Sequence, residues 1–431
     1  MATNPTPAVP HLTTALNGPL QQIETQLLEQ QPQIEAWLRQ QWRLTPAPFY
    51  GSVDLRNAGF KLAPVDTNLF PAGFNNLNPD FLPLCIHAVQ TAIERLCPTA
   101  ADVVLVPERH TRNTFYLENV AALQEIITKA GFRVRIGSIA EEITEATTLA
   151  LPSGRDLVLE PLQRTGRRVH IGDYQPCLVL LNNDLSGGRP EILEGLDQPV
   201  TPPPGIGWSN RSKSGHFGHY RNVATEFCEL IGIDPWLIDP LFRNCGKIDF
   251  KKREGEDCLS RNVSALLADI RAKYEEYGID REPFVIIKAD SGTYGMGIMS
   301  VSSVEEIHQL NRKQRNKMAS AKEGLAVSRV LIQEGVYTYE TWGEQFASAE
   351  PVVYMIDHFV VGGFYRVHQA RSATENLNAP GMQFQSLAFA GSCTNPDLHQ
   401  APDAQPNRFY AYGVIARLAL LAAAREIAEL K

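Results

Sequence analysis

Three glycines within six residues, just after a lysine that ends an apolar run, constrain this chain of 431 residues more than any other feature. Residues 284–298 read Phe-Val-Ile-Ile-Lys-Ala-Asp-Ser-Gly-Thr-Tyr-Gly-Met-Gly-Ile, so Lys288 precedes Gly292, Gly295 and Gly297. Dense glycines let backbone N–H groups converge on an anion, and a lysine adds a charge for phosphate. The spacing matches neither a P-loop nor a dinucleotide-binding turn. A phosphate-covering loop is the leading interpretation, and a purely structural turn is the alternative.

Composition sets the class of protein. The apolar fraction is 44%, the charged fraction is 20% and the net charge is −8, which gives no reason to expect nucleic acid or an anionic membrane as a partner. No apolar run approaches the roughly 20 residues that span a bilayer, and the first residues lack the features of a secretory signal. The seven cysteines are scattered, without a CxxC pair. We therefore expect a globular cytoplasmic protein of two or three domains, with no oligomeric state indicated.

The order of patterns along the chain predicts four parts of an α/β protein. Residues 1–47 form an N-terminal helical segment, because apolar side chains recur there at helical spacing. Residues 48–97 hold a strand pair and a connecting helix, and residues 98–245 form an α/β domain on the substrate side. Residues 246–431 carry the glycine loop and end in a long helix, about 408–430, so we expect them to form the nucleotide-binding domain.

Further segments accompany the glycine loop in a fixed order. Residues 330–336 read Val-Leu-Ile-Gln-Glu-Gly-Val, residues 354–367 form a predicted hairpin that includes Arg366, and residues 375–381 are rich in Asn and Gly. A lysine at 247, 251 or 252 comes about forty residues before Lys288. Together these segments resemble the ATP-grasp ligases.

That resemblance implies roles for individual residues. Lys288 and Arg366 would hold phosphates and act in catalysis, while a second phosphate lysine would be Lys252 in preference to Lys247 or Lys251. The 330–336 segment would hold adenine, and the 375–381 loop would contribute Asn378. The full set of ATP-binding residues implied is Lys252, Lys288, Gly292, Thr293, Tyr294, Gly295, Gly297, Gln333, Glu334 and Val336.

A magnesium site is missing from the place where the resemblance implies it, because no acid-x-Asn pair follows residue 381. The pattern occurs instead near the beginning of the chain, with Asp54 on one predicted strand and Asp66-x-Asn68 on the next. Residues i and i+2 of a strand face the same way, and their hard oxygen ligands suit Mg²⁺. We therefore predict a circularly permuted ATP-grasp fold whose final hairpin lies at residues 50–70. The alternative is that these three are turn residues.

Two long blocks, residues 53–77 and 286–298, carry a narrower resemblance to the proteobacterial glutamate–cysteine ligase family. The resemblance covers the chain from about residue 48 to the end. It implies ATP- and Mg²⁺-dependent joining of L-glutamate to L-cysteine through γ-glutamyl phosphate, the first step of glutathione synthesis. It also fits a sequence without a Ser-His-Asp or Cys-His signature, since such an enzyme positions reactants and neutralises charge.

The amino-acid substrates need cations for their carboxylates and acids or carbonyls for their ammonium groups. Polar residues after two predicted strands, at 108–113 and 182–184, lie where α/β folds contact ligands. The residues predicted to bind these substrates are Arg56, Lys61, Asn75, Asn76, Arg109, Arg112, Arg211, Lys213 and Asn378. For each charge the alternative is a solvated or ion-paired surface group.

Three competing functions remain at this level. One is another ATP-grasp ligase, such as a glutathione synthetase-like enzyme, which differs only in its substrates. A second is an NAD-dependent oxidoreductase, which the glycine spacing disfavours. The third is a non-catalytic nucleotide-binding protein, which would be favoured if the metal carboxylates were absent.

Overall fold

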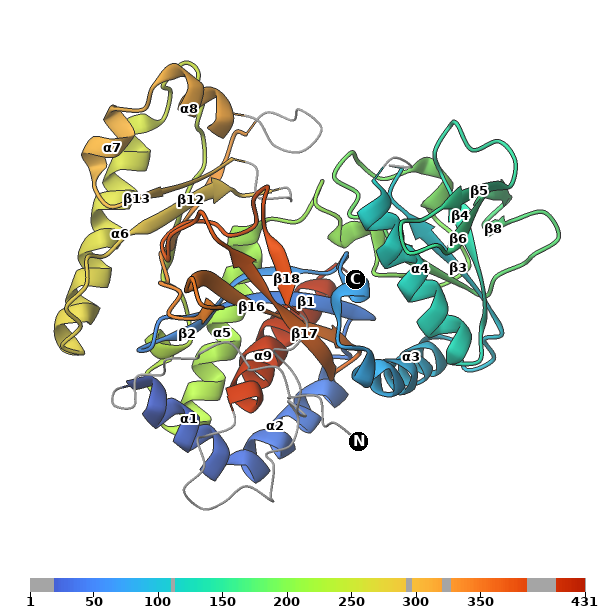
Figure 1. Cartoon of the computed structure of the whole chain (residues 1–431), viewed down its shortest axis with the longest axis horizontal. Helices are drawn as coiled ribbons and strands as arrows, with labels where there is room; N and C mark the ends of the chain where they lie inside the picture. The colour runs from blue at the N-terminus through green and yellow to red at the C-terminus, as the bar shows by residue number, and fades with distance from the viewer. Residues whose placement is uncertain (1–18, 110–112, 292–296, 320–326, 386–407, 431) are drawn as a thin grey trace.

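The computed structural model describes residues 19–109, 113–291, 297–319, 327–385 and 408–430, and it shows a mixed α/β protein. Three β-sheets build the described chain: a central antiparallel sheet, a mostly parallel sheet beside it, and a four-stranded antiparallel sheet on the other side (Figure 1). A small hairpin of β7 (Gln163–Thr165) and β8 (Arg168–His170) extends from the parallel sheet.

The central sheet joins segments that lie about 300 residues apart in sequence. Its order is β18-β17-β16-β1-β2, with β15 on the edge of β16. β1 lies antiparallel to both β2 and β16, so the strand pair from the first part of the chain extends the hairpin from its last part. The strands are β1 (Tyr50–Asn57), β2 (Leu62–Asn68), β15 (Thr341–Trp342), β16 (Ala347–Ile356), β17 (Phe359–His368) and β18 (Gln383–Gln385).

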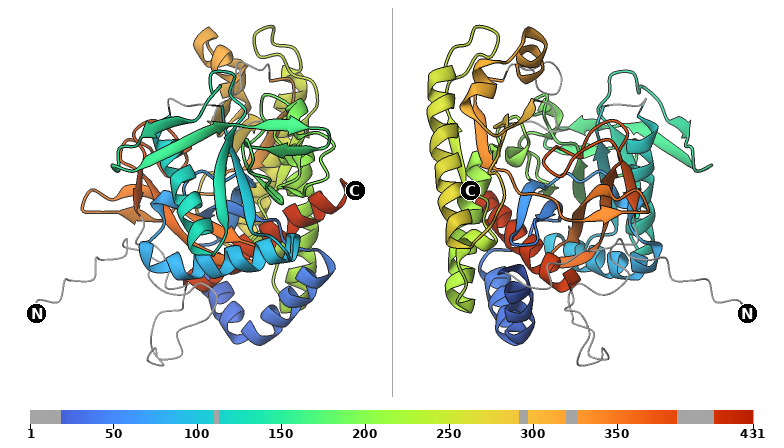
Figure 2. Two further views of the ribbon diagram at one scale, coloured as in Figure 1. Left: turned by 90° about the vertical axis from the view of Figure 1, so that its right-hand side faces the viewer. Right: turned by 60° about the vertical axis from the view of Figure 1, so that its left-hand side comes forward.

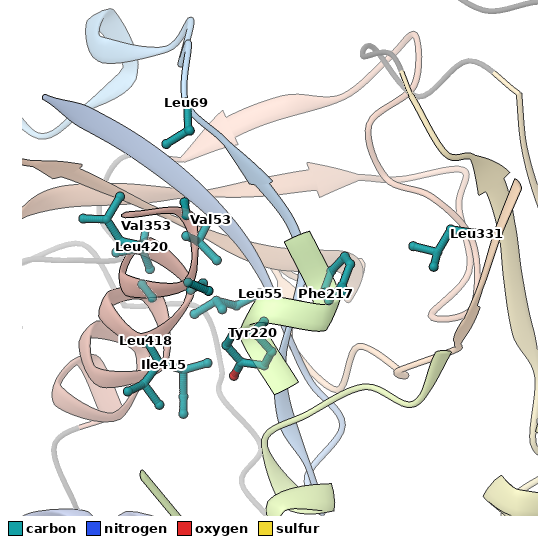
Figure 3. Packing of buried hydrophobic residues seen from close by; sticks show 14 of the residues in the cluster. Val53, Leu55, Leu69, Phe217, Tyr220, Leu331, Val353, Ile415, Leu418 and Leu420 are labelled. Carbon is teal, nitrogen blue, oxygen red and sulfur yellow. The ribbon is translucent and has the colours of Figure 1, made fainter. Parts of the chain in front are cut away.

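Alternation along β1 gives this sheet two different faces, because successive side chains of a strand point to opposite sides. Val53 and Leu55 turn toward α9 (Arg408–Ala428), whose Leu418 and Leu420 lie in the same buried cluster (Figure 3). The fit is close: a Cβ added at Gly51 would come within 2.9 Å of Leu420 Cδ1. The other face, which carries Ser52 and Asp54, is left for the cleft described below.

Three more helices cover the α9 side of the sheet. They are α1 (Pro19–Glu29), α2 (Gln31–Leu44) and α5 (Lys213–Ile231), and they are seen together with α9 in Figure 2. Arg417 of α9 binds Glu35 of α2 through both terminal nitrogens, at 2.9 and 2.8 Å. The helix that ends the described chain is thus held beside the residues that lead into β1.

The second sheet has the order β10-β9-β3-β4-β6-β5 and is parallel except at β5. Its strands are β3 (Asp102–Pro107), β4 (Arg133–Ser138), β5 (Thr147–Ala150), β6 (Asp156–Pro161), β9 (Leu178–Asn182) and β10 (Val200–Thr201), accompanied by α3 (Leu82–Leu96) and α4 (Thr114–Lys129). The carboxyl end of β9 contacts the central region, because Asn182 Nδ2 donates to the Pro71 carbonyl at 2.9 Å. This end of the sheet therefore meets the cleft.

The third sheet has the order β11-β14-β12-β13. Its strands are β11 (Phe242–Cys245), β12 (Val285–Ala289), β13 (Ile298–Val301) and β14 (Val330–Glu334), and its helices are α6 (Glu256–Glu276), α7 (Val304–His308) and α8 (Arg312–Met318). The domain boundary predicted after residue 245 would separate β11 from its partner β14 and α5 from α9. β11 and α5 thus pack with elements that come after the predicted boundary.

No helix in the described part of the chain is long and apolar enough to cross a bilayer. The apolar run at residues 418–427 belongs to α9, where most of its side chains are buried against the central sheet and α5.

Candidate active site

A cavity of about 260 Å³ opens where the three sheets meet. The free face of the central sheet forms its floor, β12 and β14 form one wall, and the residues that follow β3 and β9 form another. It gathers twelve of the residues that the sequence singled out: Asp54, Arg56, Asp66, Asn68, Asn76, Lys213, Lys288, Gln333, Glu334, Val336, Arg366 and Asn378. Segments far apart in the sequence therefore meet in one cleft.

Strand register arranges the floor in three rows, each running across the strands. All of these side chains line the cavity. The first row is Asn68, Ser52 and Tyr354, the second is Asp66, Asp54, Val352 and Phe364, and the third is Glu350, Arg366 and Phe384.

Two carboxylates stand directly opposite each other in the middle row. Asp54 pairs in register with Asp66, and each already binds a cation: Arg366 Nη1 lies 2.8 Å from Asp54 Oδ2, and Lys213 Nζ lies 2.7 Å from Asp66 Oδ1. Burial raises the pKa of Asp54, and Glu350 and Asp66 add to that rise, although Arg366 opposes it. For Asp66 burial acts in the same direction, but Lys213 and Lys288 outweigh it and hold the pKa of that carboxyl below its usual range.

Three cations from two segments hold three consecutive residues of β2. Lys288 Nζ donates to the Val65 carbonyl at 2.6 Å, Lys213 binds the Asp66 carboxylate, and Arg211 Nη1 donates to the Thr67 carbonyl at 2.8 Å. Lys288 is 5% exposed, and burial lowers the pKa of its ammonium group to about 7, although Asp66 opposes that effect. Asp66 and Asp54 thus favour the charged form of Lys288 against burial.

The segment 211–214, at the start of α5, ties this strand to the glycine loop. Asp290, which follows β12, accepts hydrogen bonds from the Ser214 N–H at 2.8 Å and from its hydroxyl at 2.9 Å. Arg211 is buried, and its Nε lies 3.0 Å from Glu426 Oε1 of α9. Arg211 and His216 bring the pKa of Glu426 to about 2, although burial opposes them. The segment 211–214 thereby fixes the positions of β2, α9 and the base of the glycine loop relative to one another.

Arg56 and Arg366 share Glu350 in a buried ionic network. Arg56 Nε lies 3.0 Å from one oxygen of Glu350, and Arg366 Nη1 lies 2.7 Å from the other. Arg56 also donates to the carbonyls of Val336, Ala373 and Glu375. Its guanidinium group is thus used in holding the 330–336 segment and the 373–375 loop together, and we expect it to position those segments.

The wall on the β12–β14 side is mainly apolar, formed by Val65, Ile286, Ile298 and Val336. Gln333 is 1% exposed, lines the cavity and has a buried Nε2 without a hydrogen-bond partner. An apolar slot edged by amide and backbone groups suits a nucleobase.

The Glu334 carboxylate is bound by other groups of the protein, although Glu334 is among the residues that line the cavity. Its oxygens accept from Lys61 Nζ at 2.7 Å, from Trp236 Nε1 at 3.2 Å and from the Leu241 N–H at 2.9 Å. Lys61 is fully buried against Glu334 and does not line the cavity, so the structure does not bring it together with the other residues predicted to bind substrates. A buried ammonium group requires a counterion, so the side chains of Lys61 and Glu334 are both used in this ion pair.

Other predicted residues lie elsewhere. Lys252 is exposed, 3.8 Å from Asp249, and does not line the cavity. Asn75 and Arg109 are exposed and Arg211 is buried behind β2, so none of these three lines it either. Gly297 borders a neighbouring cavity instead. The predictions for Arg112, Gly292, Thr293, Tyr294 and Gly295 lie outside the described residues.

Sequence reasoning missed several side chains of the floor. Glu350, Tyr354 and Phe364 belong to a hairpin of which only Arg366 was singled out. Their alternation along β16 and β17 is the signal that could have placed them on the same face as Arg366. Glu108, Asn182 and Asp184 do line the cavity, in agreement with the rule that ligands meet the carboxyl ends of parallel strands.

Comparisons with known proteins agree on one family. A family model described as glutamate-cysteine ligase matches residues 24–427. A solved structure from Methylobacillus flagellatus KT, of a protein named as a candidate gamma-glutamylcysteine synthetase, is 60% identical in sequence, with a TM-score of 0.91. The match covers 98% of this chain and 99% of that one.

Two other solved structures show much weaker similarity. D-alanyl-alanine synthetase A from Vibrio cholerae is 11% identical over 74% of this chain and 81% of its own, with a TM-score of 0.33. A glutathione synthetase-like effector from Globodera pallida is 9% identical over 85% and 80%, with a TM-score of 0.37. These TM-scores are too low to support any argument about this chain. No curated protein gives a significant match.

Proposed function

The chain belongs to the glutamate–cysteine ligase family and is an ATP-dependent ligase that joins L-glutamate to L-cysteine, and we propose that it does so in the cleft between the three sheets. The products are γ-glutamylcysteine, ADP and phosphate, and the reaction is the first step of glutathione biosynthesis. The observation that carries the assignment of the site is the meeting of Lys288 and Lys213 with Val65 and Asp66 of β2. Phosphate-binding cations and metal-binding oxygens thereby share one cleft.

The fold that we propose is a circularly permuted ATP-grasp arrangement. In that arrangement a long helix leads into a strand pair, and here α9 lies against β1 and β2 although it follows them in sequence by more than 300 residues. β1 also pairs with β16, which completes one continuous sheet. Residues held side by side in this way make a different cut in the chain tolerable.

ATP would lie with its base against the apolar wall at Ile286 and Val336 and its phosphates toward Lys288 and Arg366. The loop at residues 292–297 would cover the phosphates. Lys213, which lines the cleft, replaces Lys252 in our proposal as the second phosphate-binding lysine. We also place Asn76 and Asn378 at the amino-acid substrates, since both line the cavity.

The donor set of β1 and β2 fits Mg²⁺. Asp54 and Asp66 face each other in register, and both already bind cations, while Asn68 lines the same cleft and bonds Phe70 through its carboxamide. Within the described chain no group of three His, Cys, Asp or Glu side chains forms a metal cage. One or two carboxylates plus phosphate oxygens are the usual ligands of Mg²⁺. Asp54, Asp66 and Asn68 would hold the ion, which would neutralise phosphate charge when bound.

In the proposed reaction the γ-carboxylate of glutamate attacks the γ-phosphorus of ATP, which releases ADP and forms γ-glutamyl phosphate. The amine of cysteine then attacks the acyl carbon, phosphate departs, and the nitrogen loses a proton. The side chains of this protein act by binding and orientation: Lys288 and Arg366 offset phosphate charge, and the Glu350 network fixes Arg366. No protein nucleophile takes part. The six described cysteines are free thiols, which fits our proposal of a reducing, cytoplasmic setting.

The test is product formation by the purified protein. With ATP, Mg²⁺, glutamate and cysteine, we expect phosphate and γ-glutamylcysteine in equal amounts. Replacing the amino acids by γ-glutamylcysteine and glycine should give no glutathione, which separates this activity from a glutathione synthetase. Binding of ATP without phosphate release under either condition would refute the proposal.

A further inference from the structure

An aromatic wall adjoins the two carboxylates of the cleft floor. It is formed by Tyr354 of β16, Phe364 of β17 and Phe384 of β18, all of which line the cavity. The ring of Phe364 lies 5.3 Å from that of Tyr354 and 4.9 Å from that of Phe384, centroid to centroid. The three rings therefore form one continuous apolar surface, which none of the roles assigned above uses.

Strand register fixes how far this surface lies from the reacting groups. Asp54 is opposite Val352, and Val352 is opposite Phe364, so two strand spacings separate Asp54 from Phe364. At about 4.8 Å per spacing, their Cα atoms lie about 10 Å apart. Both side chains line the same cavity, so a group held at the Asp54 carboxylate lies on the same face of the sheet as the aromatic surface, two strand spacings from Phe364.

The loop after β2 closes the space over the wall. Phe70, Ala72 and Gly73 line the same cavity. A Cβ added at Gly73 would come within 2.4 Å of the Tyr354 hydroxyl and 3.2 Å of Phe364 Cε1. The Gly73 backbone thus already lies against the wall at this point, and a Cβ there would have to displace the Tyr354 hydroxyl.

The chemistry of the second step says what this space should hold. The attacking amine and the side chain of the acceptor amino acid share one Cα, so by standard bond lengths a cysteine sulfur lies roughly 3–4 Å from its nitrogen. The acceptor side chain must therefore lie close to the reaction centre. Sulfur makes favourable contacts with aromatic rings, and apolar surroundings favour the neutral thiol, which keeps sulfur from competing with the amine as the nucleophile.

We propose that Tyr354, Phe364 and Phe384, with Gly73 above them, form the subsite that takes the thiol side chain of the acceptor and selects cysteine. This inference rests on the proposed function, because it assumes that the ligation takes place in this cleft. Tyr354 is buried, while Phe384 is 38% exposed at the edge of the sheet.

The test compares acceptors. We would measure kcat/KM for L-cysteine, L-2-aminobutyrate and L-serine with the wild-type protein, Phe364→Leu and Phe384→Leu, using Phe346→Leu as the matched control at an exposed ring outside the cavity. Loss of the sulfur–aromatic contacts should lower kcat/KM for cysteine about 3- to 10-fold and leave aminobutyrate nearly unchanged. The KM values for ATP and glutamate should stay the same. Gly73→Ala, which narrows the space, should weaken all three acceptors.

Two results would overturn the inference. An unchanged preference for cysteine over aminobutyrate in both folded leucine variants would show that the wall does not contact the thiol. A higher KM for glutamate with no change for cysteine would assign the wall to the donor substrate. Phe384→Leu guards against misfolding, because this ring lies at an exposed edge. If the wild-type control forms no γ-glutamylcysteine, the proposed function fails and this inference fails with it.

Discussion

Replacing Glu334 by Gln tests whether its carboxylate stabilises the 330–336 segment or binds the nucleobase. The side chain is 1% exposed and faces the fully buried Lys61, whose Nζ is 2.7 Å away. That ammonium group also donates to the Asp239 carbonyl at 2.9 Å and lies 4.4 Å from the centroid of the Trp236 ring. Gln can still accept from Trp236 and Leu241, so the substitution removes mainly the negative charge.

The loss in free energy of unfolding follows from the charge of Lys61, which Glu334→Gln leaves behind. Removing one partner of a buried ion pair costs about 3–5 kcal/mol, since the remaining ion has no counterion. For a chain of 431 residues the conversion is about 1 °C per kcal/mol, so Tm should fall by roughly 3–6 °C. Burial already lowers the pKa of Lys61, so the folded protein holds this proton less tightly than the unfolded chain does. Stability therefore rises with pH between this lowered pKa and about 10.5, the pKa in the unfolded chain, and the defect of Glu334→Gln should shrink over that range.

Thermal unfolding followed by circular dichroism measures this effect. Glu344→Gln, at an exposed position of the β15–β16 turn, is the matched control and should leave Tm unchanged. Adding Lys61→Met to Glu334→Gln should recover part of the loss, because it removes the stranded charge. Below its melting temperature the single variant should keep its KM for ATP within about 2-fold, since the carboxylate is already bound by protein groups. An unchanged Tm with a much higher KM would refute this reasoning and assign the carboxylate to adenine.

Three further predictions concern the cleft. Burial lowers the pKa of Lys288 to about 7, so its charge is lost as pH rises. The kcat/KM for ATP should therefore fall above about pH 7 in the wild type and stay flat in Lys288→Arg. Parallel pH profiles of the two proteins would contradict this. Asp66→Asn should lower kcat by about 10²- to 10³-fold and weaken Mn²⁺ binding measured by calorimetry. Asp80→Asn, at an exposed position, should do neither. Intact metal binding in Asp66→Asn would exclude the proposed magnesium site. Glu426→Gln leaves Arg211 without its buried counterion and should raise the KM for ATP with little change for glutamate; equal changes for both substrates would indicate general loosening of the fold instead.

Local patterns in the sequence already fix several parts of this site. Alternation along a strand puts Asp66 and Asn68 on one face of β2 whatever the rest of the chain does. The apolar run before Lys288 makes a strand that delivers the lysine to a glycine loop. The hairpins predicted at residues 50–70 and 354–367 are confirmed as β1–β2 and β16–β17. These features depend on residues a few positions apart, so the sequence alone is enough to predict them.

Only the tertiary structure decided which of these parts meet, and with which partners. The pairing of β1 with β16 brings Asp54 to Arg366 across 312 residues, and no local period specifies that register. Tertiary structure also decided the partners of Lys61 and Glu334. The sequence shows two charged residues suited to a ligand, whereas the fold buries them together as an ion pair. A buried charge must find its counterion wherever packing brings one, and packing is a property of the whole chain.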